Sequence, residues 1–183
     1  MAAGAGAAGP SVVAEAVAVF QEVAAASAAA ALEEVGNIMS FFTPLPKIDH
    51  DRVVAAIAAA EQRTSGEIRV VVARHPAADP VAAAQSHFER LGMTHTKLRN
   101  GVLIYLAPRS HTFAVIGDTA VHDKCGDAFW RLLAAAMAVQ FKRGEFTEGL
   151  VHGVERAGAL LAEHFPRSPD DHNELPNQVE ETD

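Results

Sequence analysis

The chain has 183 residues, of which 49% are hydrophobic and 21% charged, so it can bury a sizeable core and belongs to the globular class. Its net charge of −8 is unevenly spread: residues 1–46 carry −4, residues 167–183 carry −5 and residues 47–166, by difference, carry +1. A nearly neutral central region excludes a nucleic-acid-binding surface, and a single cysteine, Cys125, excludes an internal disulfide and a cysteine-based zinc site.

Residues 1–38 form a low-complexity extension ahead of the domain. Ala accounts for fifteen of the first thirty-one residues, which favours a helix over residues 11–35. On that helix the larger apolar residues Val13, Val17 and Phe20 form only a thin stripe. We therefore expect a frayed or loosely docked extension.

The extension does not resemble a targeting signal. A signal peptide begins with a basic region, whereas the first basic residue here is Lys47, and Glu15 and Glu22 interrupt the apolar stretch. Its unbroken apolar runs are also shorter than the about 18 residues that a membrane span requires. We expect a cytoplasmic protein without a membrane segment.

Seven elements are predicted in chain order after Phe41: helix, strand, helix, strand, strand, helix and helix. The first helix is capped by Asp49 or Asp51, and the second begins with Asp79 as N-cap and Pro80 at its first position. The expected strands cover residues 68–73, 101–107 and 112–116, and the last two helices cover residues 123–140 and 145–164. The acidic, proline-containing tail over residues 167–183 is expected to be disordered.

The pattern of these elements predicts the fold. Residues 101–107 are apolar without alternation, which is typical of a strand covered on both faces. A helical crossover makes the first two strands parallel, and the short link at residues 108–110 makes the third strand antiparallel to the second. Residues 39–166 are therefore expected to form one α/β domain, a three-layer α/β/α sandwich with a small mixed sheet and helices on both faces.

Several short motifs in this region resemble the TPM domain family, in the form of its short bacterial members. They are Ala60-Glu61-x-x-Thr64-x-Gly66-Glu67-Ile68, Phe88-x-x-Leu91-Gly92, Asn100-Gly101-Val102-Leu103-Ile104, Ile116-Gly117-Asp118, Phe129-Trp130, Phe141-x-x-Gly144-x-Phe146-x-x-Gly149-Leu150, His164-Phe165-Pro166 and Asn173-Glu174-Leu175-Pro176. The resemblance covers roughly residues 39–176 and implies a Rossmann-like sandwich. It also implies acid-phosphatase activity, as described for thylakoid-lumen members, and calcium binding at an acidic loop cluster, as in some members. Met39 resembles the usual start of short members.

The inferred strand directions bring polar residues together at one edge of the sheet. The starts of the first two strands and the end of the third meet there, with the start of the next helix, and this collects Glu67, Asn100, Asp118 and Asp123. Carboxylate and amide oxygens are the ligands that Ca²⁺ and Mg²⁺ prefer. The sequence therefore predicts a divalent-cation site at this edge, with the helix N-terminus beside it for a phosphate oxygen.

Simpler interpretations of the same residues stay open. Asp118 and Asp123 are also typical capping and first-turn residues, and Glu67 is also typical of a solvated strand end. His122, at the same edge, is the candidate catalytic acid or base, or else a solvated loop histidine. Cys125 has either a lowered pKa in a first helical turn or the character of a buried, inert thiol.

Two classes of function follow. The first is a phosphate-ester hydrolase assisted by Ca²⁺ or Mg²⁺, which the family resemblance implies. The second is a non-catalytic module. It would bind an ion for its own stability or for ion-dependent interaction with a protein partner, or it would be associated with stress or repair. The sequence shows no obvious nucleophile for phosphate-ester hydrolysis, which favours the second class.

Overall fold

The computed structural model describes residues 46–168 and 175–182, so the predictions for residues 1–38 lie outside the described residues. Five of the elements are α2 (His50–Glu61), β1 (Ile68–Ala73), α3 (Pro80–Arg90), β2 (Val102–Ala107) and β3 (Thr112–Gly117). They are followed by α4 (Thr119–Lys142), α5 (Phe146–His164) and β4 (Val179–Thr182), and short 3₁₀ turns lie at Met93–His95 and Pro108–Ser110. None of the described helices is long and apolar enough to span a bilayer.

The sheet has four strands in the order β3-β2-β1-β4. β1 is parallel to β2, with Ile68 opposite Val102, and β2 is antiparallel to β3, with Val102 opposite Gly117. These pairings confirm the predicted crossover and hairpin. β4 adds a parallel strand at the free edge of β1, with Val70 opposite Val179, in the tail where the sequence predicts no strand.

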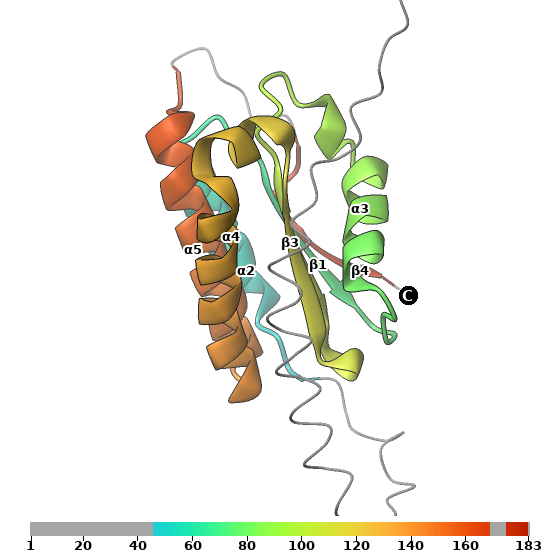
Figure 1. The fold of residues 1–183 in the computed structure, drawn as a ribbon. Helices are drawn as coiled ribbons and strands as arrows, with labels where there is room; N and C mark the ends of the chain where they lie inside the picture. The colour runs from blue at the N-terminus through green and yellow to red at the C-terminus, as the bar shows by residue number, and fades with distance from the viewer. Residues whose placement is uncertain (1–45, 169–174, 183) are drawn as a thin grey trace, which may run out of the picture.

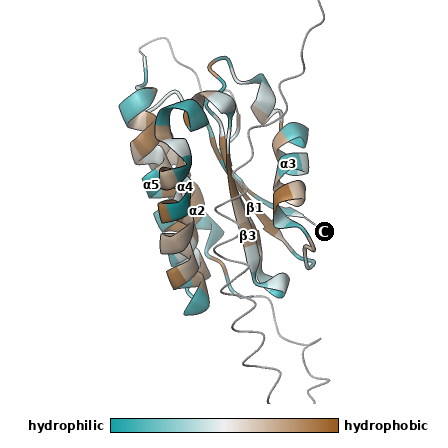
Figure 2. Cartoon of the chain, in the orientation of Figure 1, coloured by the Kyte–Doolittle hydropathy of each residue, from teal (hydrophilic) through white to brown (hydrophobic). Residues whose placement is uncertain are grey.

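Helices cover both faces of the sheet, as expected for an α/β/α sandwich (Figure 1). α2, α5 and α4 lie side by side on one face, and α3 lies on the other. All six residues of β1 and of β2 are buried, which explains why neither strand alternates in sequence. Figure 2 shows the strands as a hydrophobic layer between helices whose polar residues face outward.

Alternate strand residues supply two separate cores. Ile68, Val70, Ile104 and Val115 pack toward α2, α4 and α5, whereas Val71, Leu103 and Ile116 pack toward α3. The helices approach closely where glycine allows it. A Cβ at Gly158 of α5 would lie 2.5 Å from the Cβ of Ala60 in α2, so only glycine fits that contact.

Three of the four helix starts agree with the prediction, α5 to within one residue, and that of α4 does not. Asp49 caps α2, and Asp79 caps α3 with Pro80 at its first position. α4 begins at Thr119, four residues before the predicted start at Asp123, because Asp118 accepts the Thr119 N–H and closes the first turn directly after β3. Gly126 (φ 63°) then breaks the helix into two segments.

Candidate functional site

The buried polar and charged side chains of the described residues all lie at one end of the sheet, which we call the polar edge. It is the upper end in Figure 1, where β1 and β2 begin and β3 ends. Burying a polar side chain costs free energy unless partners replace its water, so each of these residues needs a partner within the fold or a ligand. The seven residues are Glu61, Thr64, Glu67, Arg69, Thr96, Asn100 and Asp118.

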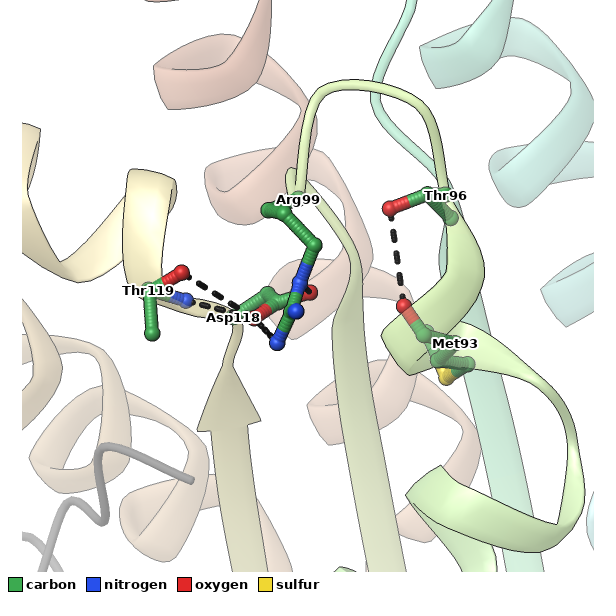
Figure 3. Close-up of polar contacts among 5 residues, drawn as sticks. All are labelled: Met93, Thr96, Arg99, Asp118 and Thr119. Atoms are coloured by element: carbon green, nitrogen blue, oxygen red, sulfur yellow. Dashed lines mark hydrogen bonds and ion pairs between the residues drawn. The ribbon is translucent and has the colours of Figure 1, made fainter. Parts of the chain in front are cut away.

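Asp118 and Arg99 form an ion pair at the centre of this edge (Figure 3). The Asp118 carboxylate is only 4% exposed and accepts two hydrogen bonds from Arg99, from Nε at 2.7 Å and from Nη2 at 2.8 Å. Arg99 has a left-handed backbone (φ 52°), which is unfavourable for a residue with a side chain. This bidentate geometry is that of a strong charge-assisted ion pair, so Arg99 balances the negative charge of Asp118.

The N-terminus of α4 is closed by local hydrogen bonds. Asp118 Oδ1 accepts the Thr119 N–H at 2.7 Å, and the Arg99 carbonyl accepts the Ala120 N–H at 3.2 Å. The Asp118 carbonyl accepts the N–H groups of Val121 and His122, both at 3.0 Å. The Asp118 N–H donates to the Gly101 carbonyl at 2.9 Å, so the N–H groups of residues 118–121, the four that a helix start usually offers to an anion, are all engaged. The predicted phosphate contact at this helix has no free donor.

A second part of the polar edge lies around the start of β1. Here Glu61, Glu67 and Ser65 line a pocket of about 220 Å³, together with Thr64, Gly66, Asn177 and Arg167. Asn100 connects the pocket to the ion pair, because its Nδ2 donates to Ser65 Oγ at 3.3 Å and its neighbour in the chain is Arg99. Asn100 is 1% exposed and Glu67 3% exposed. Both predicted residues are thus buried at this edge.

Glu61 is a buried carboxylate at the end of α2. Its Oε1 accepts the N–H of Ile68 at 2.8 Å, Oε2 is buried, and the side chain of Asn177 is a further hydrogen-bond partner of the carboxylate. Burial raises the pKa of Glu61 to about 7, and the nearby charge of Glu67 adds to this rise, whereas the hydrogen bonds from Ile68 and Asn177 and the charge of Arg69 oppose it. A cationic ligand in the pocket would relieve both the burial cost and the repulsion.

Arg69 supplies the buried positive charge beside these carboxylates. It is 4% exposed, and its Nε and Nη1 have no hydrogen-bond partner in the described part of the chain. Burial lowers its pKa, whereas the charges of Glu61, Glu67 and Glu180 raise it. The guanidinium therefore balances the carboxylates through space rather than through direct hydrogen bonds.

The remaining predicted residues lie on the first part of α4. Asp123 is exposed, and His122 lies with its Nε2 3.6 Å from Asp127 Oδ1. Burial raises the pKa of Cys125 to about 11, which gives it the inert character rather than the reactive one. Among the described residues, no group of three or more His, Cys, Asp or Glu side chains is placed to hold a metal ion. Glu67, Asp118 and Asp123 therefore do not form one ligand set in this structure.

Three residues of the site were not singled out from the sequence: Glu61, Arg69 and Arg99. Glu61 stands in one of the motifs that resemble the TPM family, and this place in the motif is the sequence signal that could identify it. Arg69 is the one charged residue in the strand Ile68–Ala73, which was a usable signal. Arg99 had no such signal, because its role depends on the left-handed turn that directs it to Asp118.

Comparison with known proteins decides the family. The sequence model of the TPM domain matches residues 44–160, which is more than half of the chain. This chain belongs to the TPM domain family. The solved structure of the BA42 protein from the psychrophilic bacterium Bizionia argentinensis is similar, with 41% identity and a TM-score of 0.68 over 81% of this chain and 100% of that one. A comparison with curated proteins gives no match.

Proposed function

We propose that this TPM domain is a phosphate-ester hydrolase whose site is the polar edge. The observation that carries the proposal is the confinement of the buried polar side chains of the described residues to this one end. Such groups cost stability, and proteins retain them where chemistry or binding requires them. Membership of the TPM domain family, whose thylakoid-lumen members are described as acid phosphatases, supports this reaction class.

Ca²⁺ or Mg²⁺ fits the pocket better than it fits Asp118 and Asp123. Glu61 offers a buried carboxylate whose Oε1 accepts one backbone N–H, and Glu67, Thr64, Ser65 and Asn177 supply further oxygens around the same pocket. These are hard oxygen ligands, and a bound ion would supply Lewis-acid polarisation of a phosphoryl oxygen. Because Arg69 and Arg167 lie nearby, we expect weak binding, with a dissociation constant of about 0.1–1 mM.

The chain's own residues have separate roles in this proposal. Arg99 is half-exposed while Asp118 fixes its guanidinium, so it can contact a phosphate from the solvent side without being reoriented. Asn100 holds Ser65 at the pocket rim. His122, beside the same edge, is the candidate acid or base for the leaving group.

A non-catalytic, ion-dependent interaction module is the second candidate. It is favoured by the state of Asp118, whose two oxygens are engaged by Arg99 and by the α4 N-terminus. A carboxylate held in this way is not placed to attack phosphorus. In this alternative the ion stabilises the edge for a protein partner, and no ester is turned over.

The deciding experiment is hydrolysis of p-nitrophenyl phosphate by the full chain, with and without added Ca²⁺ or Mg²⁺. We expect cation-dependent turnover that falls about 10–100-fold in Glu67→Gln, the range seen when the residues around a bound metal are altered. Glu155→Gln, an exposed carboxylate on α5, is the matched control and should retain full activity. A cation-dependent rise in melting temperature without turnover would select the module instead. If the cations cause neither turnover nor a rise in melting temperature, both proposals are contradicted.

A further inference from the structure

One segment of the tail runs from the polar edge to the opposite end of the sheet. Residues 175–182, which we call the strap, begin where Leu175 packs against the core on the α3 side. Asn177 then lines the polar-edge pocket, and β4 runs parallel to β1 as far as Thr182, which lies opposite Ala73 (Figure 1). The strap therefore contacts the proposed cation site and the far end of β1 at once.

At the pocket, the strap meets the carboxylates that would hold a cation. The side chain of Asn177 hydrogen-bonds Glu61, and Asn177 and Glu67 line the same pocket. Glu61 ends α2 and Glu67 directly precedes β1, so both belong to the body of the fold, whereas Asn177 belongs to the strap. An ion held by these oxygens would bind the body and the strap at the same time.

A second link runs through the buried guanidinium of Arg69. Burial lowers the pKa of Arg69, and the charges of Glu61, Glu67 and Glu180 raise it. Of these three carboxylates, Glu180 belongs to the strap. Docking of the strap brings its negative charge close to Arg69, which reduces the repulsion that a cation in the pocket would meet from the guanidinium.

Ion pairs hold the far end of the strap. Glu181 pairs with Arg74 at the end of β1 and with His50 of α2, whose Nε2 lies 3.4 Å from Glu181 Oε1. Glu180 Oε1 pairs with Arg90 Nη2 of α3 at 2.8 Å. These contacts join the strap to both helical layers. None of their residues lines the polar-edge pocket, so the pairs can be altered without touching the proposed cation ligands.

The strap is held more weakly than the centre of the sheet. β4 has four residues, none of them buried, whereas all six residues of β1 and of β2 are buried. The ion pairs of the strap are partly exposed, and exposed pairs contribute little each. Segments of this kind open locally while the rest of the chain stays folded, so a small change in free energy shifts the balance between docked and open strap.

We propose that docking of the strap and cation binding in the polar-edge pocket favour each other. This coupling rests on the cation site of the proposed function. The ion would hold the docked strap through Asn177, and the docked strap would improve the site through Asn177 and Glu180. Coupling between two equilibria is reciprocal, so the ion favours the docked strap by the same factor by which docking tightens ion binding.

Ca²⁺ titrations of the ¹⁵N-labelled full chain test the coupling with variants remote from the pocket. Glu181→Lys and Arg74→Glu each replace the ion pair by a repulsion, and each should raise the dissociation constant for Ca²⁺ about 5-fold. The two substitutions change the net charge in opposite directions. A through-space charge effect alone would therefore weaken Ca²⁺ binding in Glu181→Lys and strengthen it in Arg74→Glu. The double variant restores an ion pair with its signs exchanged and should bind Ca²⁺ like the wild type.

Hydrogen exchange reports on the strap itself. The Arg74 N–H donates to the Thr182 carbonyl at 2.8 Å, so its exchange follows opening of the strap. Saturating Ca²⁺ should slow this exchange about 5-fold in the wild type and leave it unchanged in Glu67→Gln. The His111 N–H, which donates to the Pro108 carbonyl at the same end of the sheet, is the control amide and should not respond to Ca²⁺.

The outcomes separate the coupling from the cation site. If Ca²⁺ binds the wild type but the two single variants follow their net charges, or the Arg74 amide does not respond to the ion, the coupling is overturned and the cation site stands. If the wild type shows no saturable Ca²⁺ binding, the cation site of the proposed function is overturned together with the coupling.

Discussion

Asp118 joins three elements through one carboxylate. It accepts the Arg99 guanidinium from the loop before β2, caps α4, and directly follows β3. Because the residue is buried, removing its carboxylate leaves the Thr119 N–H without its cap and Arg99 without its counter-charge. The contact is therefore structural even if the polar edge is also catalytic.

We expect Asp118→Ala to lower the free energy of unfolding by about 1–3 kcal/mol, the range for losing a helix cap and a buried acceptor. Urea denaturation of the variant and of the wild type measures this difference. Asp123→Ala is the matched control, because Asp123 is exposed on the same helix, and its cost should be close to zero. Equal effects of the two substitutions would show that the Arg99 pair does not hold this edge.

Glu61 makes stability depend on pH in a defined direction. Its pKa in the folded chain is about 7, above its ordinary value of 4.5, because burial disfavours the charged form. The folded state therefore binds the proton more tightly than the unfolded state does. This contribution to stability is complete below about pH 4.5 and is lost as the pH rises through 7.

In a metal-free buffer, Glu61→Gln should raise the free energy of unfolding by about 1–3 kcal/mol at a pH about one unit above 7, and by much less near pH 4.5. The Gln oxygen can still accept the Ile68 N–H, and the substitution replaces the other, charged oxygen with a neutral NH₂ group of nearly the same size. Thermal melts across this pH range provide the measurement, with Glu155→Gln as control. A variant that is less stable than the wild type at high pH would contradict the burial argument.

At the scale of elements, the central strand β2 decides whether the sheet is packed on both faces. Ile104 is fully buried and faces α4 and α5. We expect Ile104→Ala to cost about 2–5 kcal/mol in unfolding free energy, as for other buried large-to-small substitutions. Leu132→Ala, on the outer face of α4, should cost little in comparison. A cost for Ile104→Ala below about 1 kcal/mol would place β2 at an exposed edge.

The elements also show what the sequence could and could not predict. β1, β2, β3 and their directions followed from apolar runs and short links, because these patterns are local. β4 could not be found in this way, since residues 179–182 contain two Glu in four positions and gain their strand geometry only by pairing with β1. The start of α4 was placed late because the cap is set by Asp118 in three dimensions.

The candidate site shows the same division. Topology brought Glu67, Asn100 and Asp118 to one edge, and each is buried there. It did not show that Arg99 engages both oxygens of Asp118, or that Glu61 lines a pocket with Glu67 at this edge. The partners of a side chain depend on its rotamer and on local turns such as the left-handed one at Arg99. The order of helices and strands does not determine either.

At the scale of the whole molecule, residues 46–168 contain both hydrophobic cores apart from contributions by Leu175 and Val179. The alignment with the similar Bizionia structure covers 81% of this chain and all of that one. A chain that starts at Met39 should therefore unfold cooperatively, with a melting temperature within about 2–4 °C of the full chain, as for a loss near 1 kcal/mol. Calorimetry of both chains tests this, and a loss of cooperative unfolding would contradict it.

The central claim is that the polar edge is the functional site, and an NMR titration of the ¹⁵N-labelled full chain tests it most directly. Ca²⁺, Mg²⁺ and inorganic phosphate are added in turn. We predict saturable shifts at the amides of residues 61–69, 96–101 and 118–122, with the cation effects lost in Glu67→Gln and retained in Glu155→Gln. Shifts centred at the opposite end of the sheet, or no saturable shift with any of the three ions, would contradict the claim.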